Sequence, residues 1–274
     1  MKFSLSNNKL DFSFENSIRP VMSFDKEVEQ ACEDIRLASI FTDKPIWLML
    51  SGGMDSELIA GIFIKNKVPF SCLIVQFKND INKSDVDYAL EFVKTNNIPF
   101  KIHKMDITHF MNDCRIRPNP ICNSINSFMQ IEWMKIVNDI GGYGVTGSGE
   151  QRYNQDMKLS YTFGQLVPLI WQNNNNIPGC PYFFLQNPAI INSFALDASL
   201  YKGDVGDLGH NIKTAIYKKY WPGLIERQKF TGYEKVQNLR NLIELELSQK
   251  YPYMDNKVVF TNEEVIQKTK YLQS

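Results

Sequence analysis

The sequence lacks any pattern that would pair its cysteines. Five thiols are present, an odd number, and no CxxC or CxxH spacing occurs. This excludes a disulfide framework and leaves no zinc-binding pattern, and the three histidines also lack metal-ligand spacing. We therefore expect reduced and mostly buried thiols. The cysteines are Cys32, Cys72, Cys114, Cys122 and Cys180.

An excess of charge of one sign and long apolar runs are also missing. Thirty basic residues balance thirty acidic ones, so no overall field draws the chain to nucleic acid or an anionic membrane. No apolar run is long enough to span a bilayer, and the first residues lack the form of a signal peptide. We therefore expect a cytoplasmic protein. We also expect it to be globular, because 43% of its 274 residues are hydrophobic, enough for a sizeable core.

The most informative stretch is PIWLMLSGGMDSELIAGIF, residues 45–63. Its apolar run IWLML predicts a buried strand of a parallel sheet. Gly52 and Gly53 then permit a sharp turn and a close approach of ligand to main chain. Apolar residues at helical spacing follow Ser56, so backbone N–H groups at a helix N-terminus would lie beside the hydroxyls of Ser51 and Ser56. This predicts a phosphate-binding loop, although the Walker pattern GxxxxGK[ST] is absent.

Strands and helices alternate along the first 150 residues. Apolar runs predict further strands at residues 69–77 and 100–107 and from Tyr143, and helical periodicity predicts helices at residues 23–41, 84–97 and 124–140. The pattern predicts an α/β, Rossmann-like parallel sheet with helices on both faces, followed by a largely helical C-terminal region. Residues 114–120 (CRIRPNP) are expected to be a break, in which Arg115 and Arg117 either approach an anion or are solvated.

The SGGMDS segment resembles the SGGxDS signature of the PP-loop (N-type) ATP pyrophosphatases, a superfamily that includes asparagine synthetase, GMP synthetase and NAD synthetase. These enzymes cleave ATP between its α and β phosphates and transfer AMP to a substrate oxygen. The resemblance covers roughly residues 45–150 and implies ATP and Mg²⁺ as cofactors. It implies that pyrophosphate is bound by Ser51, Gly52, Gly53 and Ser56, that Asp55 binds magnesium, and that the strand ends near Gln76, Phe77 and Ile107 flank adenine and ribose.

A second glycine-rich turn occurs in YGVTGSGE, residues 143–150. It resembles the SGEGADE segment of asparagine synthetase, whose synthetase domain is the member of the superfamily that this sequence most resembles. The match assigns Gly149 to the nucleotide site and Glu150 to catalysis at the activated carbonyl. The metal-binding aspartate of that segment has no counterpart in register, and Asp156 is the available substitute. The alternative is that Glu150 is only a polar residue after a turn.

Basic residues are frequent between positions 202 and 235. PP-loop enzymes commonly use a lysine from the C-terminal part against pyrophosphate, and KFTGYEK, residues 229–235, has a glycine turn between two lysines. This makes Lys229 and Lys235 the candidates, against the alternative of a solvated basic face. The predicted organisation is short strands in residues 1–22, an ATP-binding domain in 23–157 and a helical substrate region in 158–274.

The combined prediction is a ligase that adenylates a carboxylate or carbonyl oxygen of a small molecule and then amidates it. Because the loop begins at Ser51, we expect no glutaminase domain before it, and we expect ammonia or an amino compound, free or from a separate glutaminase, as the amine donor. The sequence leaves open whether the protein forms a homo-oligomer. One alternative is a PP-loop enzyme acting on tRNA or a nucleobase, although the cysteine patterns of such enzymes are missing. A sulfate-type reductase would need a cysteine beyond Cys180. A non-catalytic ATP-binding interaction protein is the third alternative.

Overall fold

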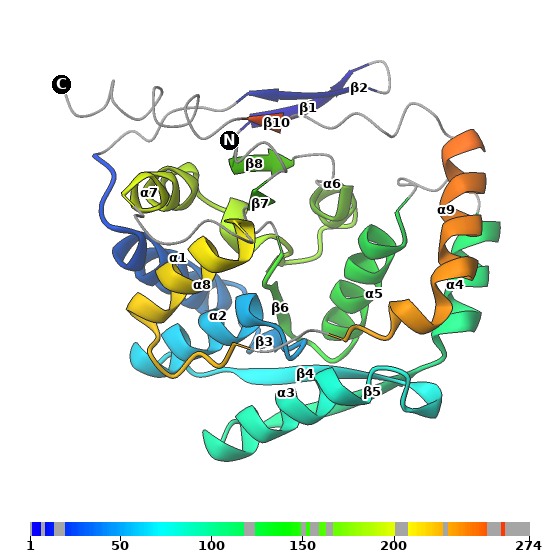
Figure 1. The fold of residues 1–274 in the computed structure, drawn as a ribbon, viewed down its shortest axis with the longest axis horizontal. Helices are drawn as coiled ribbons and strands as arrows, with labels where there is room; N and C mark the ends of the chain where they lie inside the picture. Colours follow the sequence, from blue (N-terminus) through cyan, green and yellow to red (C-terminus); the bar gives the residue numbers. More distant parts are fainter. Residues whose placement is uncertain are drawn as a thin grey trace.

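A five-stranded parallel sheet forms the centre of the protein. The computed structural model describes residues 2–6, 9–13, 20–117, 124–148, 152–153, 159–162, 167–200, 208–226, 230–250 and 259–260. The strand order is β5-β4-β3-β6-β9, and every neighbouring pair is parallel. The strands are β3 (Ile46–Met49), β4 (Ser71–Phe77), β5 (Phe100–Met105), β6 (Tyr143–Thr146) and β9 (Gly179–Cys180). The predicted α/β, Rossmann-like sheet is confirmed (Figure 1).

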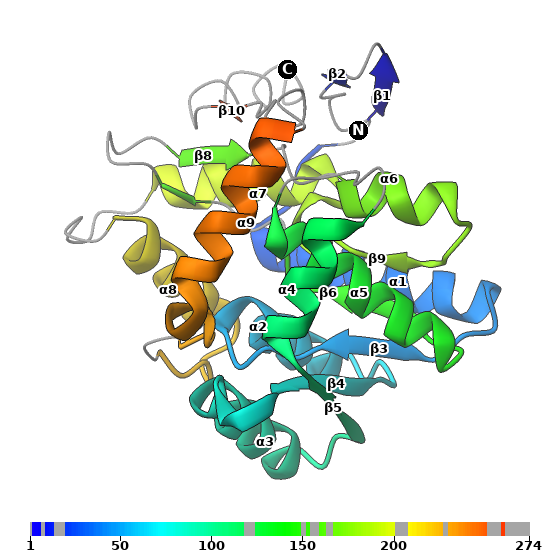
Figure 2. The same cartoon turned by 90° about the vertical axis from the view of Figure 1, so that its right-hand side faces the viewer.

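Helices cover both faces of this sheet (Figures 1 and 2). Successive strand residues point to opposite faces, so Leu48 packs in the larger core cluster and Met49 in a smaller one. The larger cluster contains residues of α1 (Phe24–Phe41), α2 (Met54–Lys65), α3 (Lys83–Thr95), α7 (Pro188–Ser199) and α8 (Leu208–Tyr220). The opposite face of the sheet is covered by α4 (Ile107–Ile116), α5 (Ile125–Asp139) and α9 (Gln237–Lys250).

The order of the strands creates a switch point at β3. From β3 the chain adds β4 and then β5 on one side, and it returns to add β6 and β9 on the other side. In open α/β sheets the crevice at the carboxyl ends of the strands beside such a switch point is the usual ligand site. The SGGMDS loop follows β3 and the second glycine-rich turn follows β6, so both turns lie at this crevice.

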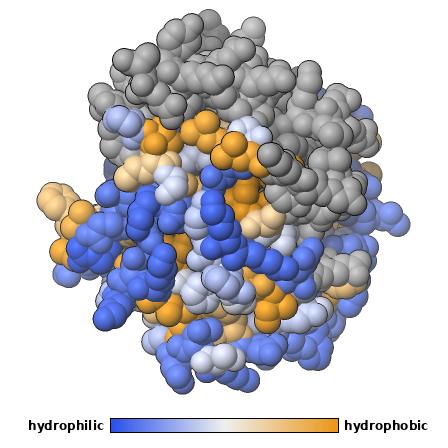
Figure 3. Space-filling view, turned by 60° about the vertical axis from the view of Figure 1, so that its left-hand side comes forward, coloured by the Kyte–Doolittle hydropathy of each residue, from blue (hydrophilic) through white to orange (hydrophobic). Residues whose placement is uncertain are grey.

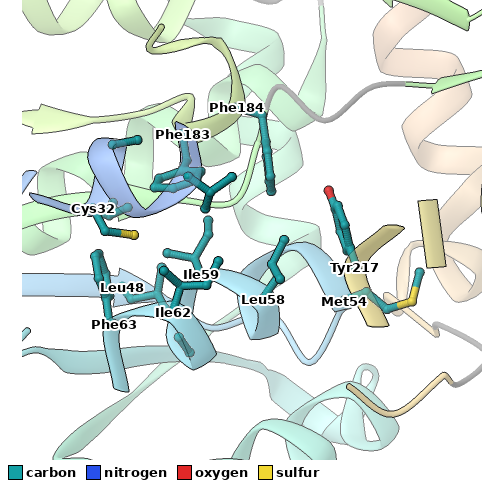
Figure 4. Close-up of a cluster of buried hydrophobic side chains, with 14 of the residues drawn as sticks. Cys32, Leu48, Met54, Leu58, Ile59, Ile62, Phe63, Phe183, Phe184 and Tyr217 are labelled. Atoms are coloured by element: carbon teal, nitrogen blue, oxygen red, sulfur yellow. The ribbon is translucent and has the colours of Figure 1, made fainter. Parts of the chain in front are cut away.

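The C-terminal helices share the main core with the sheet. Figure 4 shows Phe183, Phe184 and Tyr217 packed with residues of β3 and α2, among them Leu58 and Ile59. Strand β9, also from this region, pairs with β6. The C-terminal region is largely helical, as predicted, and its helices include α6 (Val167–Asn174), which packs on α5. The predicted boundary at residue 157 lies outside the described residues and stays a prediction.

The prediction that a break begins at residue 114 is wrong. Helix α4 continues to Ile116, because Ile107, Phe110, Met111 and Cys114 form an apolar stripe at helical spacing and are all buried. The helix begins with a side-chain cap, in which the backbone N–H of His109 donates to Asp106 Oδ1 at 3.0 Å. Residues 118–120 lie outside the described residues.

Short elements complete the described chain. The hairpin β1 (Lys2–Ser6) and β2 (Lys9–Ser13) is antiparallel and lies in the region where short strands were predicted. Small antiparallel pairs join β8 (Leu159–Thr162) to β7 (Arg152–Tyr153) and to β10 (Val259–Phe260). The 3-10 turns are η1 (Lys78–Asp80), η2 (Phe183–Leu185) and η3 (Tyr233–Val236).

The surface mixes polar and apolar side chains. On the face drawn in Figure 3, hydrophobic side chains are interspersed among hydrophilic ones. None of the helices in the described part of the chain has the length and apolar character needed to cross a membrane. Four cysteines lie in this part, and all four are buried and free: Cys32, Cys72, Cys114 and Cys180.

Candidate functional site

A cavity of about 530 Å³ opens at the carboxyl ends of the central strands. Its lining comes from parts of the chain that are far apart in sequence. The SGGMDS loop and the turn after β6 form one side, and α5 and the ends of β3 and β4 form an apolar wall. The start of α3, helix α8, residues 231–233 and helix α9 contribute the remainder. All five loop residues predicted to bind nucleotide line it: Ser51, Gly52, Gly53, Asp55 and Ser56.

The backbone of the loop has the conformation that its glycines permit. Gly52 has φ +74°, in the left-handed region that glycine adopts without steric cost. Gly53 then caps α2. The Ser56 hydroxyl donates to Gly53 O at 3.0 Å and accepts from the backbone N–H of Ser51 at 3.2 Å. These bonds hold the first turn of α2 toward the cavity, where helix N–H groups favour anions.

The two glycine-rich turns are in direct contact. A Cβ atom built on Gly147 would lie 2.9 Å from the backbone nitrogen of Ser56, so this position has no room for a side chain. Ser148 follows, and its hydroxyl accepts a hydrogen bond from Gln130 Nε2 at 2.7 Å. Both glycine-rich turns therefore lie at the same edge of the sheet.

Helix α8 supplies a lysine to the loop. Lys213 Nζ lies 2.8 Å from Asp55 Oδ1 and donates to Asp55 Oδ2 at 2.9 Å. One turn later, the Tyr217 hydroxyl donates to Asp55 Oδ1 at 3.0 Å. Tyr217 is fully buried and stacks on Phe184 with ring centroids 5.9 Å apart. Sequence reasoning missed this pair, although a lysine and a tyrosine four residues apart on one helix face were a usable signal.

A second carboxylate anchors the chain that follows α8. Asp85, on the first turn of α3, is 4% exposed, and its Oδ1 accepts from the backbone N–H of Phe230 at 3.0 Å. Its main-chain oxygen lies 2.2 Å from the position that a Gly52 Cβ would take. The hydrogen bond between Phe230 and Asp85 brings the next residues, Thr231 and Tyr233, into the lining of the cavity. In the described part of the KFTGYEK segment, residues 230–235, these two residues thus reach the site.

Helix α9 adds a second cation to the cavity lining. The Arg240 guanidinium carbon lies 5.0 Å from the ring centroid of Tyr233, and its Nε donates to Glu244 Oε1 at 3.3 Å. Glu244 also accepts from the backbone N–H of Ile125 at 3.0 Å. The guanidinium is therefore positioned by an aromatic face and a carboxylate that is itself fixed to α5.

The structure separates the other predicted site residues into three groups. Phe77 lines the cavity. Gln76 and Lys235 do not: Gln76 Nε2 donates to Asp80 Oδ1 at 2.7 Å, and Lys235 is exposed on η3. The remaining predicted residues lie outside the described part of the chain: Gly149, Glu150, Asp156 and Lys229.

Neither arginine of the CRIRPNP segment lies at the cavity. Arg115 Nε lies 2.5 Å from Glu246 Oε2, which joins α4 to α9. Arg117 lies 3.4 Å from Glu132 Oε2 and over the ring of Phe128. Both side chains thus make structural contacts between helices.

Two described carboxylates line the cavity beside the loop, Asp55 and Asp85, and Asp85 Oδ1 already accepts from the backbone N–H of Phe230. Within the described ranges, no group of three or more His, Cys, Asp or Glu residues is arranged to hold a metal ion. Mg²⁺ is usually held by one or two carboxylates together with substrate phosphates. Asp55 therefore fits the role of a carboxylate ligand to Mg²⁺, with phosphate oxygens of a bound nucleotide as further ligands.

Comparison with known proteins gave structural neighbours only. The chain matches no protein-family model and no curated protein. It is similar to an NMN synthetase from Francisella tularensis, at 15% identity and a TM-score of 0.38 over 86% of this chain and 97% of that chain. It is also similar to an NH3-dependent NAD synthetase from Campylobacter jejuni, at 16% identity and a TM-score of 0.40 over 86% of this chain and 97% of that chain. A third similar structure is a glutamine-dependent NAD+ synthetase from Acinetobacter baumannii, at 13% identity and a TM-score of 0.40 over 85% of this chain and 47% of that chain. Likenesses at this level carry no argument about function.

Proposed function

We propose that this protein is an ATP pyrophosphatase that adenylates a carboxylate or carbonyl oxygen of a small molecule and then amidates it. It would resemble the synthetase domain of asparagine synthetase. The observation that supports this most is the contact of Lys213 with Asp55 inside a cavity that the SGGMDS loop lines. An anion-binding helix terminus, a carboxylate and a lysine are the groups that magnesium-bound triphosphate requires.

Catalysis would depend on charge stabilisation by groups that are already in position. The N–H groups at the start of α2 and the Lys213 ammonium stabilise negative charge at the α and β phosphates. Asp55 would hold Mg²⁺, which neutralises charge on the departing pyrophosphate. Tyr217 keeps the Asp55 carboxylate oriented through its 3.0 Å hydrogen bond. Lys229 stays a candidate for a further phosphate contact from the KFTGYEK segment, and Lys235 would have to turn toward the cavity from its exposed position on η3 to make one.

The amidation half of the reaction would use the second turn. Ser148 lines the cavity, and we propose that Gly149 approaches the nucleotide with its backbone. Glu150 would accept a proton from the attacking amine or orient it. The amine donor would be ammonia or another amino compound, free or delivered by a separate glutaminase.

The test of this proposal is a product assay with label in the α phosphate of ATP. Purified protein is incubated with Mg²⁺, labelled ATP, ammonium, and pools of carboxylic acids, amino acids or tRNA. The proposal predicts AMP that depends on one small-molecule pool and is lost in Asp55→Ala. AMP that depends on the tRNA pool would instead favour the base-modifying alternative, and bound but intact ATP with every pool would favour a binding protein.

A further inference from the structure

Lys213 contacts both oxygens of the carboxylate that would hold Mg²⁺. Its Nζ lies 2.8 Å from Asp55 Oδ1 and donates to Oδ2 at 2.9 Å. The Tyr217 hydroxyl also donates to Oδ1, at 3.0 Å. A Mg²⁺ ion at its usual distance from either oxygen would lie within about 5 Å of the ammonium, so the two cations repel each other. The lysine and the metal ion therefore compete for Asp55.

Of the two donors to Asp55, Lys213 is the one that can move. Tyr217 is fully buried in the main core (Figure 4). The hydroxyl of Thr214 lies 3.5 Å from Met54 Sδ, which fixes α8 to the start of α2. Lys213 instead lines the cavity on a flexible four-carbon stem. Its ammonium can leave the carboxylate while the helix that carries it stays in place.

The protein offers this ammonium little reason to leave by itself. The side chain of Lys213 is 13% exposed, and a charge with so little solvent is costly unless it is paired. The other described carboxylate of the cavity lining, Asp85, is engaged with the backbone N–H of Phe230. Lys213 should therefore move away from Asp55 when a new anion, such as a phosphate group, comes within its reach.

We infer that Lys213 takes the place of the metal ion at Asp55 and that a bound nucleotide exchanges one cation for the other. Phosphate draws the ammonium away, and Oδ2 accepts Mg²⁺ while Tyr217 keeps its bond to Oδ1. The protein therefore binds divalent metal together with nucleotide and only very weakly by itself. This inference rests on the proposed function, since it concerns the nucleotide and metal of the same cavity, and it adds the dependence of one on the other.

The first test measures binding of Mn²⁺, as a spectroscopic substitute for Mg²⁺, from the electron paramagnetic resonance signal of the free ion. Without nucleotide, Asp55→Asn should bind as much Mn²⁺ as the unaltered protein, because Asp55 takes no metal. Lys213→Met should bind one Mn²⁺ about tenfold more tightly than the unaltered protein does, and adding Asp55→Asn should abolish this gain. Lys219→Met is the matched control: it removes a charge from the same helix that pairs with Asp197 instead, and it should bring no gain.

The second test measures nucleotide binding by titration calorimetry with α,β-methylene-ATP, which cannot be cleaved between its α and β phosphates. The unaltered protein should bind this analogue about tenfold more tightly with Mg²⁺ than with EDTA, and Asp55→Asn should lose the difference. Metal binding that depends on Asp55 with nucleotide, and not without it, supports the exchange even if Lys213→Met does not fold. Lys213→Gln then repeats the Mn²⁺ measurement with a polar, uncharged side chain.

Three results would overturn the inference and leave the proposed function standing. They are a Mn²⁺ site in the unaltered protein that depends on Asp55 without nucleotide, equal Mn²⁺ binding by the unaltered protein and the Lys213 variants, and equal affinity for the analogue with Mg²⁺ and with EDTA. Failure of the analogue to bind under either condition would overturn the proposed function itself.

Discussion

Lys213 and Asp55 are 158 residues apart in the chain, and their charged groups lie 2.8 to 2.9 Å apart. The pair joins helix α8 to the first turn of α2, the helix that begins in the SGGMDS segment. Their side chains are 13% and 21% exposed, so the pair is only weakly screened by solvent. Helix α8 therefore completes a site that the N-terminal half of the sequence begins.

Removing the lysine charge should impair ATP cleavage far more than folding. We expect Lys213→Met to lower AMP formation about 100-fold, because it removes one pre-positioned donor from the phosphate site. Lys219→Met is the matched control, since Lys219 is on the same helix but pairs with Asp197 at 3.7 Å. Initial rates of AMP release from labelled ATP measure the effect. Equal rates in both variants would show that Lys213 has no part in the reaction.

Removing the Tyr217 hydroxyl should affect both stability and nucleotide affinity. Tyr217→Phe leaves the stacked ring in place but deletes the bond to Asp55, so the free energy of unfolding should fall by about 1 kcal/mol. Tyr220→Phe deletes a comparable bond to Asp197 away from the cavity. Urea unfolding should show similar losses in both variants, whereas weaker ATP binding is expected only for Tyr217→Phe. Unchanged ATP affinity in that variant would remove Tyr217 from the site.

The loop glycine should not tolerate a methyl group. Gly52→Ala would place Cβ 2.2 Å from the main-chain oxygen of Asp85, in addition to the strain of φ +74°. Gly141 has the same φ of +74°, but a Cβ there meets nothing within 4 Å. Gly141→Ala thus measures the backbone strain alone, about 1 kcal/mol. We expect Gly52→Ala to lose clearly more unfolding free energy than Gly141→Ala and to lose ATP binding, and equal losses would contradict the loop geometry.

The buried thiols should be unreactive in the folded protein. Burial raises the pKa of Cys72 and of Cys180 from the ordinary 9.0 to about 12, and burial also raises the pKa of Cys114 to about 12. Because the unfolded chain releases these protons at lower pH, their stabilising effect is complete below pH 9 and is lost as the pH rises toward 12. In a Cys122→Ser background, thiol labelling at pH 8 should require unfolding. Rapid labelling of the native protein would contradict this burial.

The fold could be predicted from the sequence where the signals are local. Strand β3, the loop at Ser51–Ser56 and helix α2 are contiguous, and their apolar period, glycines and capping residues act over a few positions. Helix α4 was missed because the polar sequence around Arg115 and the following proline suggested a break, although its apolar stripe continues to Cys114. Strand β9 has two residues, too few for any periodicity.

The cavity could be predicted on its loop side and at Phe77, where β4 ends. Gln130, Lys213 and Arg240 converge on it from three helices, and this convergence follows from tertiary packing that no local pattern encodes. Local reasoning chose Lys229 and Lys235 because a glycine-containing turn between two lysines could fold back over the phosphates. The described lysine that reaches the loop lies on α8, whose position is set by Tyr217 packing against Phe24 and Phe184.

The most direct test of the account is isotope exchange between labelled pyrophosphate and ATP. Adenylation is reversible before the amine attacks, so exchange needs Mg²⁺, ATP and the acceptor but no amine donor. The account predicts exchange that depends on a carboxylic acid and is abolished in Asp55→Ala and strongly reduced in Lys213→Met. Cleavage of ATP to ADP and phosphate, with no exchange under any acceptor, would contradict cleavage between the α and β phosphates.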